Sequence, residues 1–256
     1  MSADFTPPSP GHLGLGGIMS AALAMYRAAP RPFLAVSLVS TLPLVGLSVA
    51  GDLAYGVPAD STGRGLRELI LLVPALFLVQ ISLAATAVLT MDLLHRRPPS
   101  ASAGLELVGL RFWPLAAVNA ITILGVALGI MALVIPGLVL LVMWIYAPII
   151  AVVEARRPRA SLARSVATVR GRFWWTTGAY VAIQLTVTLA GILIGALFGT
   201  LAAPLSGNAA IIGTGLAELV AVTLVQPVAL LGVALMYLER RAAREGHWAN
   251  PGSQPE

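Results

Sequence analysis

The sequence predicts an all-α integral membrane protein with six transmembrane helices, and two observations support this class. Apolar residues make up 58% of the 256 residues, charged residues only 11%, and the mean hydropathy is +0.88. Soluble domains usually carry roughly 25% charged residues. The charges are also clustered, so that the stretches 112–153 and 173–236 contain almost none. Because about 20 apolar residues cross the hydrocarbon core once, each stretch is long enough for two crossings.

The apolar runs divide the chain into six spans within one membrane domain, 1–256. Only Pro136 and Gly137 separate the third run from the fourth, which predicts a tight turn and a helical hairpin. We expect residues 1–12 and 247–256 to be disordered, and the spans to pair as three hairpins. The predicted spans are about 33–50, 69–92, 113–135, 137–154, 174–203 and 209–238.

The placement of arginine predicts the orientation. All sixteen basic residues are arginine, and fourteen of them lie before the first span, between the second and third, between the fourth and fifth, or after the sixth. Only Arg64 and Arg67 lie on the opposite side. Basic residues resist translocation, so the pattern predicts a multi-pass protein of the cell membrane (plasma or inner) with both termini in the cytoplasm.

Three cytoplasmic segments, 13–29, 100–112 and 161–172, carry apolar stripes at helical spacing. The last two end in the same string, Arg111-Phe112-Trp113 and Arg172-Phe173-Trp174, and each follows a serine that suits an N-cap, Ser100 and Ser161. We expect an amphipathic interfacial helix before each hairpin and an internal repeat of this unit. The alternative is that positive-inside proteins commonly place arginine and aromatic residues at span entrances. The stripes are Leu15, Met19, Ala22 and Tyr26; Ala101, Leu105, Val108 and Phe112; and Leu162, Val166, Val169 and Phe173.

Residues along most of the chain resemble the membrane domain found attached to some glycerophosphoryl diester phosphodiesterases, which also occurs alone. The resemblance implies a fold and topology more than an activity, because the family's chemistry resides in a separate soluble barrel with metal-binding His and Glu residues. This chain has no room for such a barrel. Ala243 departs from the pattern, which has a basic residue there. The resembling residues are Pro136-Gly137, Trp144, Pro148, Glu154, Ser161, Arg164-Ser165, Arg170-Gly171, Phe173-Trp174, Pro227, Tyr237, Glu239, Arg241 and Arg244-Glu245-Gly246.

The sequence contains no recognisable catalytic, metal-binding or cofactor-binding motif. It has no cysteine, which excludes disulfides and thiolate chemistry. Asp92 and His95 have helical i, i+3 spacing, but Arg96 and Arg97 repel a cation there and a third ligand is missing. The net charge of +5 is what arginine-rich cytoplasmic loops produce, so we expect no nucleic-acid partner. We therefore expect a protein that is not an enzyme and needs no cofactor.

One acid, Glu218, lies well inside a span, about 13 Å from its outer end. Ionisable groups at such depth are costly and suggest function, here a proton or cation site. Gln226, Gln184 and Asn119 are candidate partners in a polar seam. The alternative is that Glu218 stays protonated and hydrogen-bonds between helices.

Six arginines between the fourth and fifth spans form the second candidate site. Guanidinium groups match phosphate oxygens, so beside an interfacial helix they suit anionic phospholipid headgroups. The alternative is that they only fix the topology. They are Arg156, Arg157, Arg159, Arg164, Arg170 and Arg172.

Two groups of glycines have small-xxx-small spacing, Gly125 and Gly129 in the third span and Gly191, Gly195 and Gly199 in the fifth. We expect them to serve packing within the chain, with a homo-oligomer face as the alternative. The leading functional hypothesis is a non-enzymatic membrane protein that organises lipids or partner envelope enzymes. The alternative is a small-molecule or ion transporter that uses Glu218.

Overall fold

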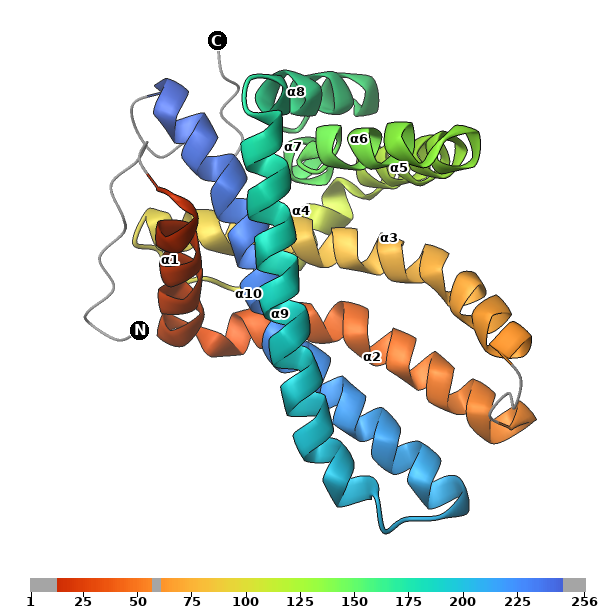
Figure 1. Ribbon diagram of the computed structural model, residues 1–256. Coiled ribbons are helices and arrows are strands. Elements are labelled where there is room, and N and C mark those ends of the chain that lie inside the picture. Colours follow the sequence, from red (N-terminus) through yellow and green to blue (C-terminus); the bar gives the residue numbers. More distant parts are fainter. Residues whose placement is uncertain (1–12, 57–60, 246–256) are drawn as a thin grey trace.

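The computed structural model describes residues 13–56 and 61–245, and within these ranges every regular element is a helix (Figure 1). The predicted disorder of residues 1–12 and 247–256 lies outside the described residues. The ten described helices are α1 (Leu15–Ala28), α2 (Pro30–Tyr55), α3 (Ser61–Leu94), α4 (Ala101–Leu110), α5 (Phe112–Ala132), α6 (Val134–Met143), α7 (Ala147–Val153), α8 (Pro158–Arg170), α9 (Phe173–Ala202) and α10 (Gly207–Glu245).

Six helical segments are long and apolar enough to cross a bilayer, which confirms the predicted number. They are Pro30–Tyr55, Ile70–Leu94, Phe112–Ala132, Val134–Val153, Phe173–Ala202 and Gly207–Ala243. The fourth is made of α6 and α7 together, with a break between them at residues 144–146. The chain is therefore a multi-pass membrane protein built entirely from helices within the described ranges.

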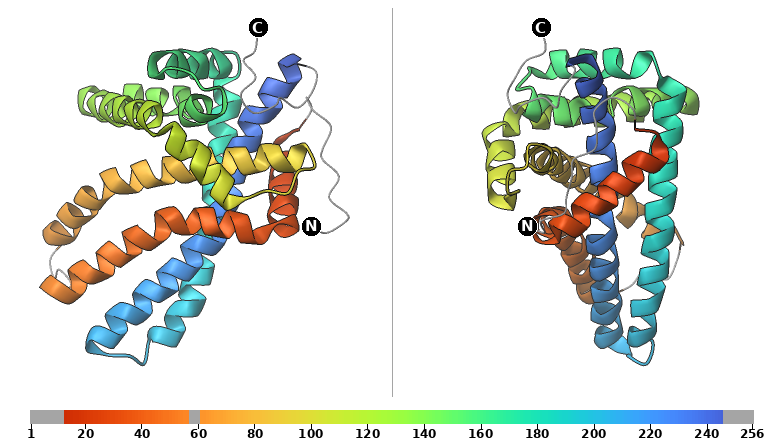
Figure 2. Two further views of the ribbon diagram at one scale, coloured as in Figure 1. Left: turned by 180° about the vertical axis from the view of Figure 1, so that it is seen from behind. Right: turned by 90° about the vertical axis from the view of Figure 1, so that its left-hand side faces the viewer.

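Consecutive long helices lie side by side as three pairs, α2 with α3, α5 with α6, and α9 with α10. Figures 1 and 2 show that the connecting ends of the pairs point apart, while their other ends converge. The short helices α1, α4 and α8 precede the three pairs in turn.

The turn between α5 and α6 is shorter than predicted and lies earlier in the chain. Only Leu133, in an extended conformation, separates the two helices. Pro136 instead falls in the first turn of α6, where a missing N–H breaks no intrahelical hydrogen bond. The predicted turn at Pro136 and Gly137 is therefore wrong by about three residues.

Glycines bring the backbones of this pair close together. A Cβ added to Gly129 would lie 2.8 Å from the Cα of Gly137, and one added to Gly125 would lie 2.5 Å from the ring of Trp144. Neither contact leaves room for a side chain. The first small-xxx-small group thus packs within the chain.

Helix α10 is the central helix of the protein. It contacts α1, α2, α3 and α9, and almost every side chain from Ala229 to Glu239 is buried. By contrast, only 6% of the apolar window of α9 is buried, against 67% for α10. Helix α9 therefore lies at the periphery and presents most of its apolar surface outward, as a lipid-facing helix does.

The short helices pack their apolar sides onto the protein. In α1 the buried side chains lie on one face of the helix, which is adjacent to the predicted stripe and shares Ala22 with it. They are Ile18, Ala21, Ala22 and Met25. In α4 a Cβ on Gly104 would meet Leu89 at 2.5 Å, so this helix lies tightly against α3. The predicted apolar faces are thus largely covered by other helices of the same chain.

The two predicted N-cap serines differ in the structure. Ser100 caps α4, because its Oγ accepts a hydrogen bond from the Ala103 N–H at 3.4 Å. Ser161 does not cap α8, because the helix already begins at Pro158 with Arg157 in the N-cap position. The hydroxyl of Ser161 instead donates to the Arg157 carbonyl at 3.1 Å. The prediction for Ser161 is wrong because Pro158 itself favours the first turn of a helix.

Candidate functional site

A fully buried acid, Glu154, lies at the end of α7, where the fourth span ends and the arginine-rich segment 156–172 follows. Its Oε2 accepts a hydrogen bond from Arg156 Nε at 2.7 Å, and its Oε1 lies 3.7 Å from Arg164 Nε. The Tyr237 hydroxyl of α10 also donates to Oε1. We call Glu154, Arg156, Arg164 and Tyr237 the Glu154 cluster. A buried carboxylate is tolerated where opposite charges and donors surround it, as they do here.

A serine of α8 forms hydrogen bonds to the backbone at the break in the fourth span. Helix α6 ends at Met143, and its carbonyl accepts a hydrogen bond from Ser165 Oγ at 2.7 Å. The same Oγ accepts a hydrogen bond from the Tyr146 N–H at 3.3 Å. These backbone groups have lost helical partners, which would be costly in a membrane without a replacement. One serine side chain supplies both.

Further contacts attach α10 to its neighbours at the same level. The Arg240 guanidinium lies 4.9 Å from the ring centre of Trp175 and donates to the Thr168 carbonyl at 3.3 Å. Buried Glu239 accepts a hydrogen bond from the Leu13 N–H at 3.3 Å. The end of α10 is thus joined to α8, α9 and the segment that precedes α1.

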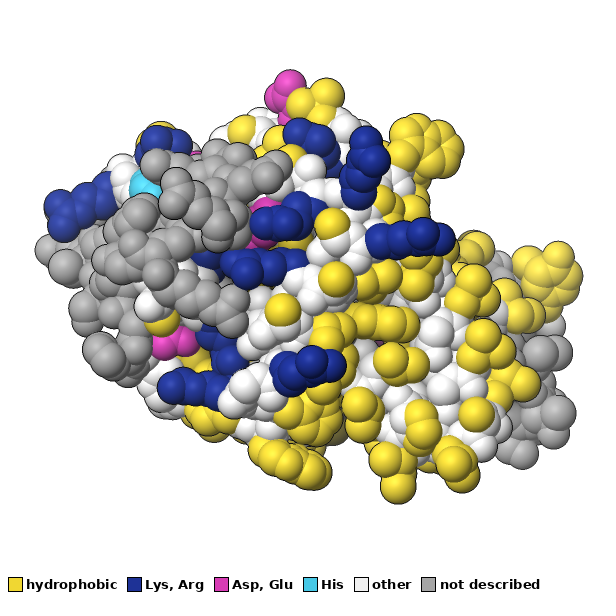
Figure 3. Space-filling view, turned by 90° about the horizontal axis from the view of Figure 1, so that it is seen from above, with side chains coloured by type: hydrophobic (Ala, Val, Ile, Leu, Met, Phe, Trp, Pro, Cys, Tyr) yellow, Lys and Arg dark blue, Asp and Glu magenta, His cyan; other side chains and the backbone are white. Residues whose placement is uncertain are grey.

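The structure divides the six predicted headgroup arginines into two groups. Arg156 and Arg164 are half-buried and face Glu154. The other four are exposed, and within the described part of the chain none of them has an ion-pair partner: Arg157, Arg159, Arg170 and Arg172. Figure 3, viewed from above, shows arginine side chains gathered on one side of this face, with hydrophobic side chains beyond them. We call the part of the molecule that carries these six arginines, residues 156–172, the basic end.

The repeated Arg-Phe-Trp strings have the same geometry. The rings of Phe112 and Trp113 meet edge to face with centres 5.4 Å apart, and those of Phe173 and Trp174 do so at 5.4 Å as well. The two tryptophans are 80% and 82% exposed. An exposed tryptophan beside an arginine at the start of a span is typical of the aromatic belt at headgroup level.

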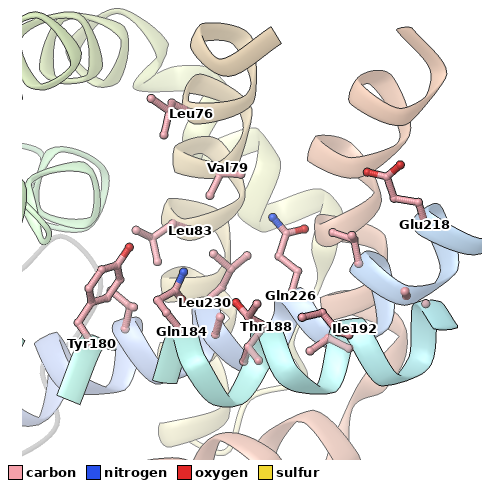
Figure 4. Close-up of a pocket in the computed structure, with 18 of the residues that line it drawn as sticks. Leu76, Val79, Leu83, Tyr180, Gln184, Thr188, Ile192, Glu218, Gln226 and Leu230 are labelled. Carbon is pink, nitrogen blue, oxygen red and sulfur yellow. The ribbon is translucent and has the colours of Figure 1, made fainter. Parts of the chain in front are cut away.

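A groove runs along the outer helix α9. It has a volume of about 700 Å³ and lies between α3, α9 and α10. Tyr180 lies at one end and Glu218 at the other, with Gln184, Thr188 and Gln226 along its length (Figure 4). We call it the α9 groove. Its walls are mostly apolar, and the glycines of the second small-xxx-small group, Gly191, Gly195 and Gly199, form part of one wall.

The structure brings together three of the four predicted intramembrane polar residues. Glu218, Gln184 and Gln226 line the α9 groove, and Gln80, which the sequence analysis missed, lines it too. Asn119 lies elsewhere, buried on α5, and neither its Oδ1 nor its Nδ2 has a hydrogen-bond partner. Asn119, which the predicted seam included, therefore lies apart from the other three, because α5 does not reach the groove.

Gln226 also belongs to a buried network of hydroxyl groups that was not predicted. Its Oε1 accepts hydrogen bonds from Ser37 Oγ at 2.8 Å and Ser40 Oγ at 3.3 Å. The Oγ of Ser82 in α3 lies at hydrogen-bond distance, 3.0 Å, from both the Val36 carbonyl oxygen and Ser40 Oγ. The network ties α2, α3 and α10 together through polar groups that the bilayer cannot satisfy.

The residues considered as metal ligands do not converge. The His95 Nδ1 donates to the Met91 carbonyl at 2.8 Å, which uses one ring nitrogen within its own helix. Among the described residues, no three His, Cys, Asp or Glu side chains lie close enough together to hold a metal ion.

Comparisons with protein-family profiles, with curated proteins and with solved structures find no match for this chain. The class that the fold defines is a multi-pass membrane protein with six helices of spanning length and apolarity.

Proposed function

We propose that the protein is a non-enzymatic component of the cell membrane that binds anionic phospholipid headgroups at its basic end and organises lipids or envelope enzymes around it. The observation that carries this proposal is the exposure of four arginines, two at each end of α8, with the exposed Trp174 following the second pair. Arg157 and Arg159 lie at the start of α8, while Arg170 and Arg172 lie at its end. Anionic headgroups attract each such arginine by about 1 kcal/mol.

The Glu154 cluster supports the proposal because it distinguishes two kinds of arginine. Arg156 and Arg164 pair with Glu154 inside the protein. The four exposed arginines remain able to bind phosphate groups. The proposed orientation puts both termini and the basic end in the cytoplasm, where anionic lipids are enriched. The resemblance to a phosphodiesterase-associated membrane domain is consistent with a partner enzyme acting on phospholipid-derived substrates.

Lipid retention tests the proposal. The double variant R170Q/R172Q, purified in native lipid, should retain less phosphatidylglycerol or other anionic lipid by mass spectrometry than the parent does. The matched control is R64Q/R67Q, which removes two charges from the other predicted side. Equal anionic lipid in both variants would contradict headgroup binding at the basic end. Fusions of an alkaline phosphatase reporter after Gly246 test the orientation, since activity there would place the C-terminus outside the cytoplasm.

A second candidate function is transport of ions or small molecules, which the position of Glu218 on the α9 groove favours. Glu218 lies at one end of the groove that Gln184 and Gln226 also line, and an acid within a span suggests a proton site. It predicts proton uptake by proteoliposomes that contain an entrapped pH dye, and loss of that uptake in Glu218→Gln. Absence of uptake with the parent protein would eliminate proton coupling.

A further inference from the structure

The α9 groove has the dimensions of a binding site for one hydrocarbon chain. It extends along α9 from Tyr180 to Gly199, which is about 29 Å of helix. The volume of about 700 Å³ is spread along this length, so the groove is long and narrow, as an extended hydrocarbon chain is.

The glycines of α9 create this space. A Cβ added to Gly191 or Gly199 would meet nothing within 4 Å, and one on Gly195 would meet the Ala221 methyl at an ordinary 3.7 Å. Gly125 and Gly129 differ, because their neighbours leave no room for a Cβ. The same spacing thus has two roles in one chain: close packing in α5 and an open wall in α9.

The polar groups of the groove suit an uncharged molecule. Gln80, Gln184 and Gln226 offer amide donors and acceptors, and the buried Gln80 Oε1 has no partner within the described structure. The Oε1 of Gln226 already accepts from Ser37 and Ser40. Among the described residues that line the groove there is no arginine, and the one acid, Glu218, lies at an end. An anionic headgroup would have no counter-charge here.

The groove also faces the bilayer. Helices α3 and α9 form its two sides with few direct contacts between them, and α10 forms its floor. Gln184 and Thr188 are exposed, so the wall that α9 provides is open from the outside. A lipid molecule could enter sideways between α3 and α9 without crossing an aqueous phase.

We propose that the α9 groove binds an acyl chain of an uncharged glycerolipid, whose ester or hydroxyl groups hydrogen-bond to Gln80, Gln184 and Gln226. The site differs from the headgroup site of the basic end in its helices, its charge and its ligand. It stands whether or not the arginines bind anionic lipid.

Photolabelling with a diacylglycerol that carries a diazirine in one acyl chain tests the proposal. The protein is reconstituted in phosphatidylcholine vesicles that contain the probe, irradiated and digested, and the labelled peptides are identified by mass spectrometry. We expect labelling on α9 and α10 along the groove. Gly191→Leu should reduce it by about tenfold, because the added side chain takes the place of the hydrocarbon. Gly178→Leu is the matched control, since Gly178 lies on the same helix, is exposed and does not line the groove.

Three results would overturn the proposal. One is labelling that is equal in Gly191→Leu and Gly178→Leu, both shown to be folded by thermal melting in detergent. Another is stronger labelling by a phosphatidylglycerol probe with the same diazirine chain, since none of the described lining residues is basic. The third concerns a second copy of the chain. Because the chain contains no cysteine, Gly195→Cys supplies a single thiol, and a disulfide-linked dimer in vesicles would show that a helix covers the groove.

The glutamines have a separate test. Gln184→Leu keeps the side chain's size but removes its amide, so labelling by the diacylglycerol probe should fall by a few-fold. A hydrocarbon probe without a headgroup, such as a diazirine-bearing alkane, should label parent and variant equally. Stronger diacylglycerol labelling of the variant would contradict hydrogen bonding to the lipid.

Discussion

The hydroxyl of Tyr237 donates a hydrogen bond to Glu154, and this contact joins α10, about two turns before its end, to the end of α7 across 83 positions of sequence. Both side chains are almost completely buried. Arg156 and Arg164 approach the same carboxylate from the chain that follows it. A single acid therefore joins the end of α7 to α8 and α10 at the basic end.

Replacing Tyr237 with phenylalanine should lower the thermal stability of the protein. The change removes a donor from a buried carboxylate, which costs about 1–3 kcal/mol. Thermal unfolding in detergent, followed by tryptophan fluorescence, measures the effect. Tyr55→Phe is the control, because Tyr55 is 92% exposed, and its melting temperature should match that of the parent. A Tyr237→Phe protein that melts with the control would show that the contact adds no stability.

The arginines of the basic segment should differ in their effect on stability. Arg164→Gln takes a positive charge from Glu154 and should cost about 1–3 kcal/mol, whereas Arg172→Gln should change little because that side chain is exposed. Denaturant unfolding in detergent distinguishes the two. If both variants unfold alike, the division of the six arginines into structural and available groups is wrong.

Replacing glycine with alanine should lower the stability of the protein at one position and raise it at another. Gly137→Ala should destabilise the α5–α6 pair by about 1–3 kcal/mol, because its Cβ would lie 2.3 Å from the Ile130 side chain. Gly109→Ala in α4 meets nothing within 4 Å and should stabilise its helix by about 0.5–1 kcal/mol. The melting temperatures of the two variants should therefore move in opposite directions. A Gly137→Ala protein that melts at or above the temperature of the parent would contradict the close approach of α5 and α6.

Gln226 should matter for stability in a way that Gln184 does not. Gln226→Leu leaves the hydroxyls of Ser37 and Ser40 without their shared acceptor and should cost about 1–3 kcal/mol. Gln184 is exposed on the groove, so Gln184→Leu should leave the melting temperature near that of the parent. If the melting temperature falls equally in both variants, the hydrogen bonds of Ser37 and Ser40 to Gln226 add no stability of their own.

The spans were predictable because hydrophobic length and charge are local properties of the sequence. Runs without charge predict all six, and in the fourth the helix is interrupted at residues 144–146, just before Pro148. The turn at Leu133 was not predictable from composition, because proline is tolerated in the first turn of a helix as well as in a loop. The extended conformation of Leu133 follows from the packing of α5 on α6.

The candidate sites were less predictable because they depend on which helices meet. Glu218, Gln184 and Gln226 converge since α9 and α10 pair, but Asn119 is buried on a helix that does not reach them. Glu154 had a local signal, a lone acid between an apolar span and several arginines. Its tie to Tyr237 had none, because α7 and α10 meet only in the folded chain.

The single-residue turn at Leu133 has a consequence for how the protein is made. Leu133, Val134 and Ile135 are 69%, 60% and 74% exposed, so the tip of this hairpin offers the translocation machinery an apolar point and no hydrophilic loop. Only Leu133 separates α5 from α6, so we expect the two helices to enter the bilayer together as one unit, after residue 153 has been synthesised.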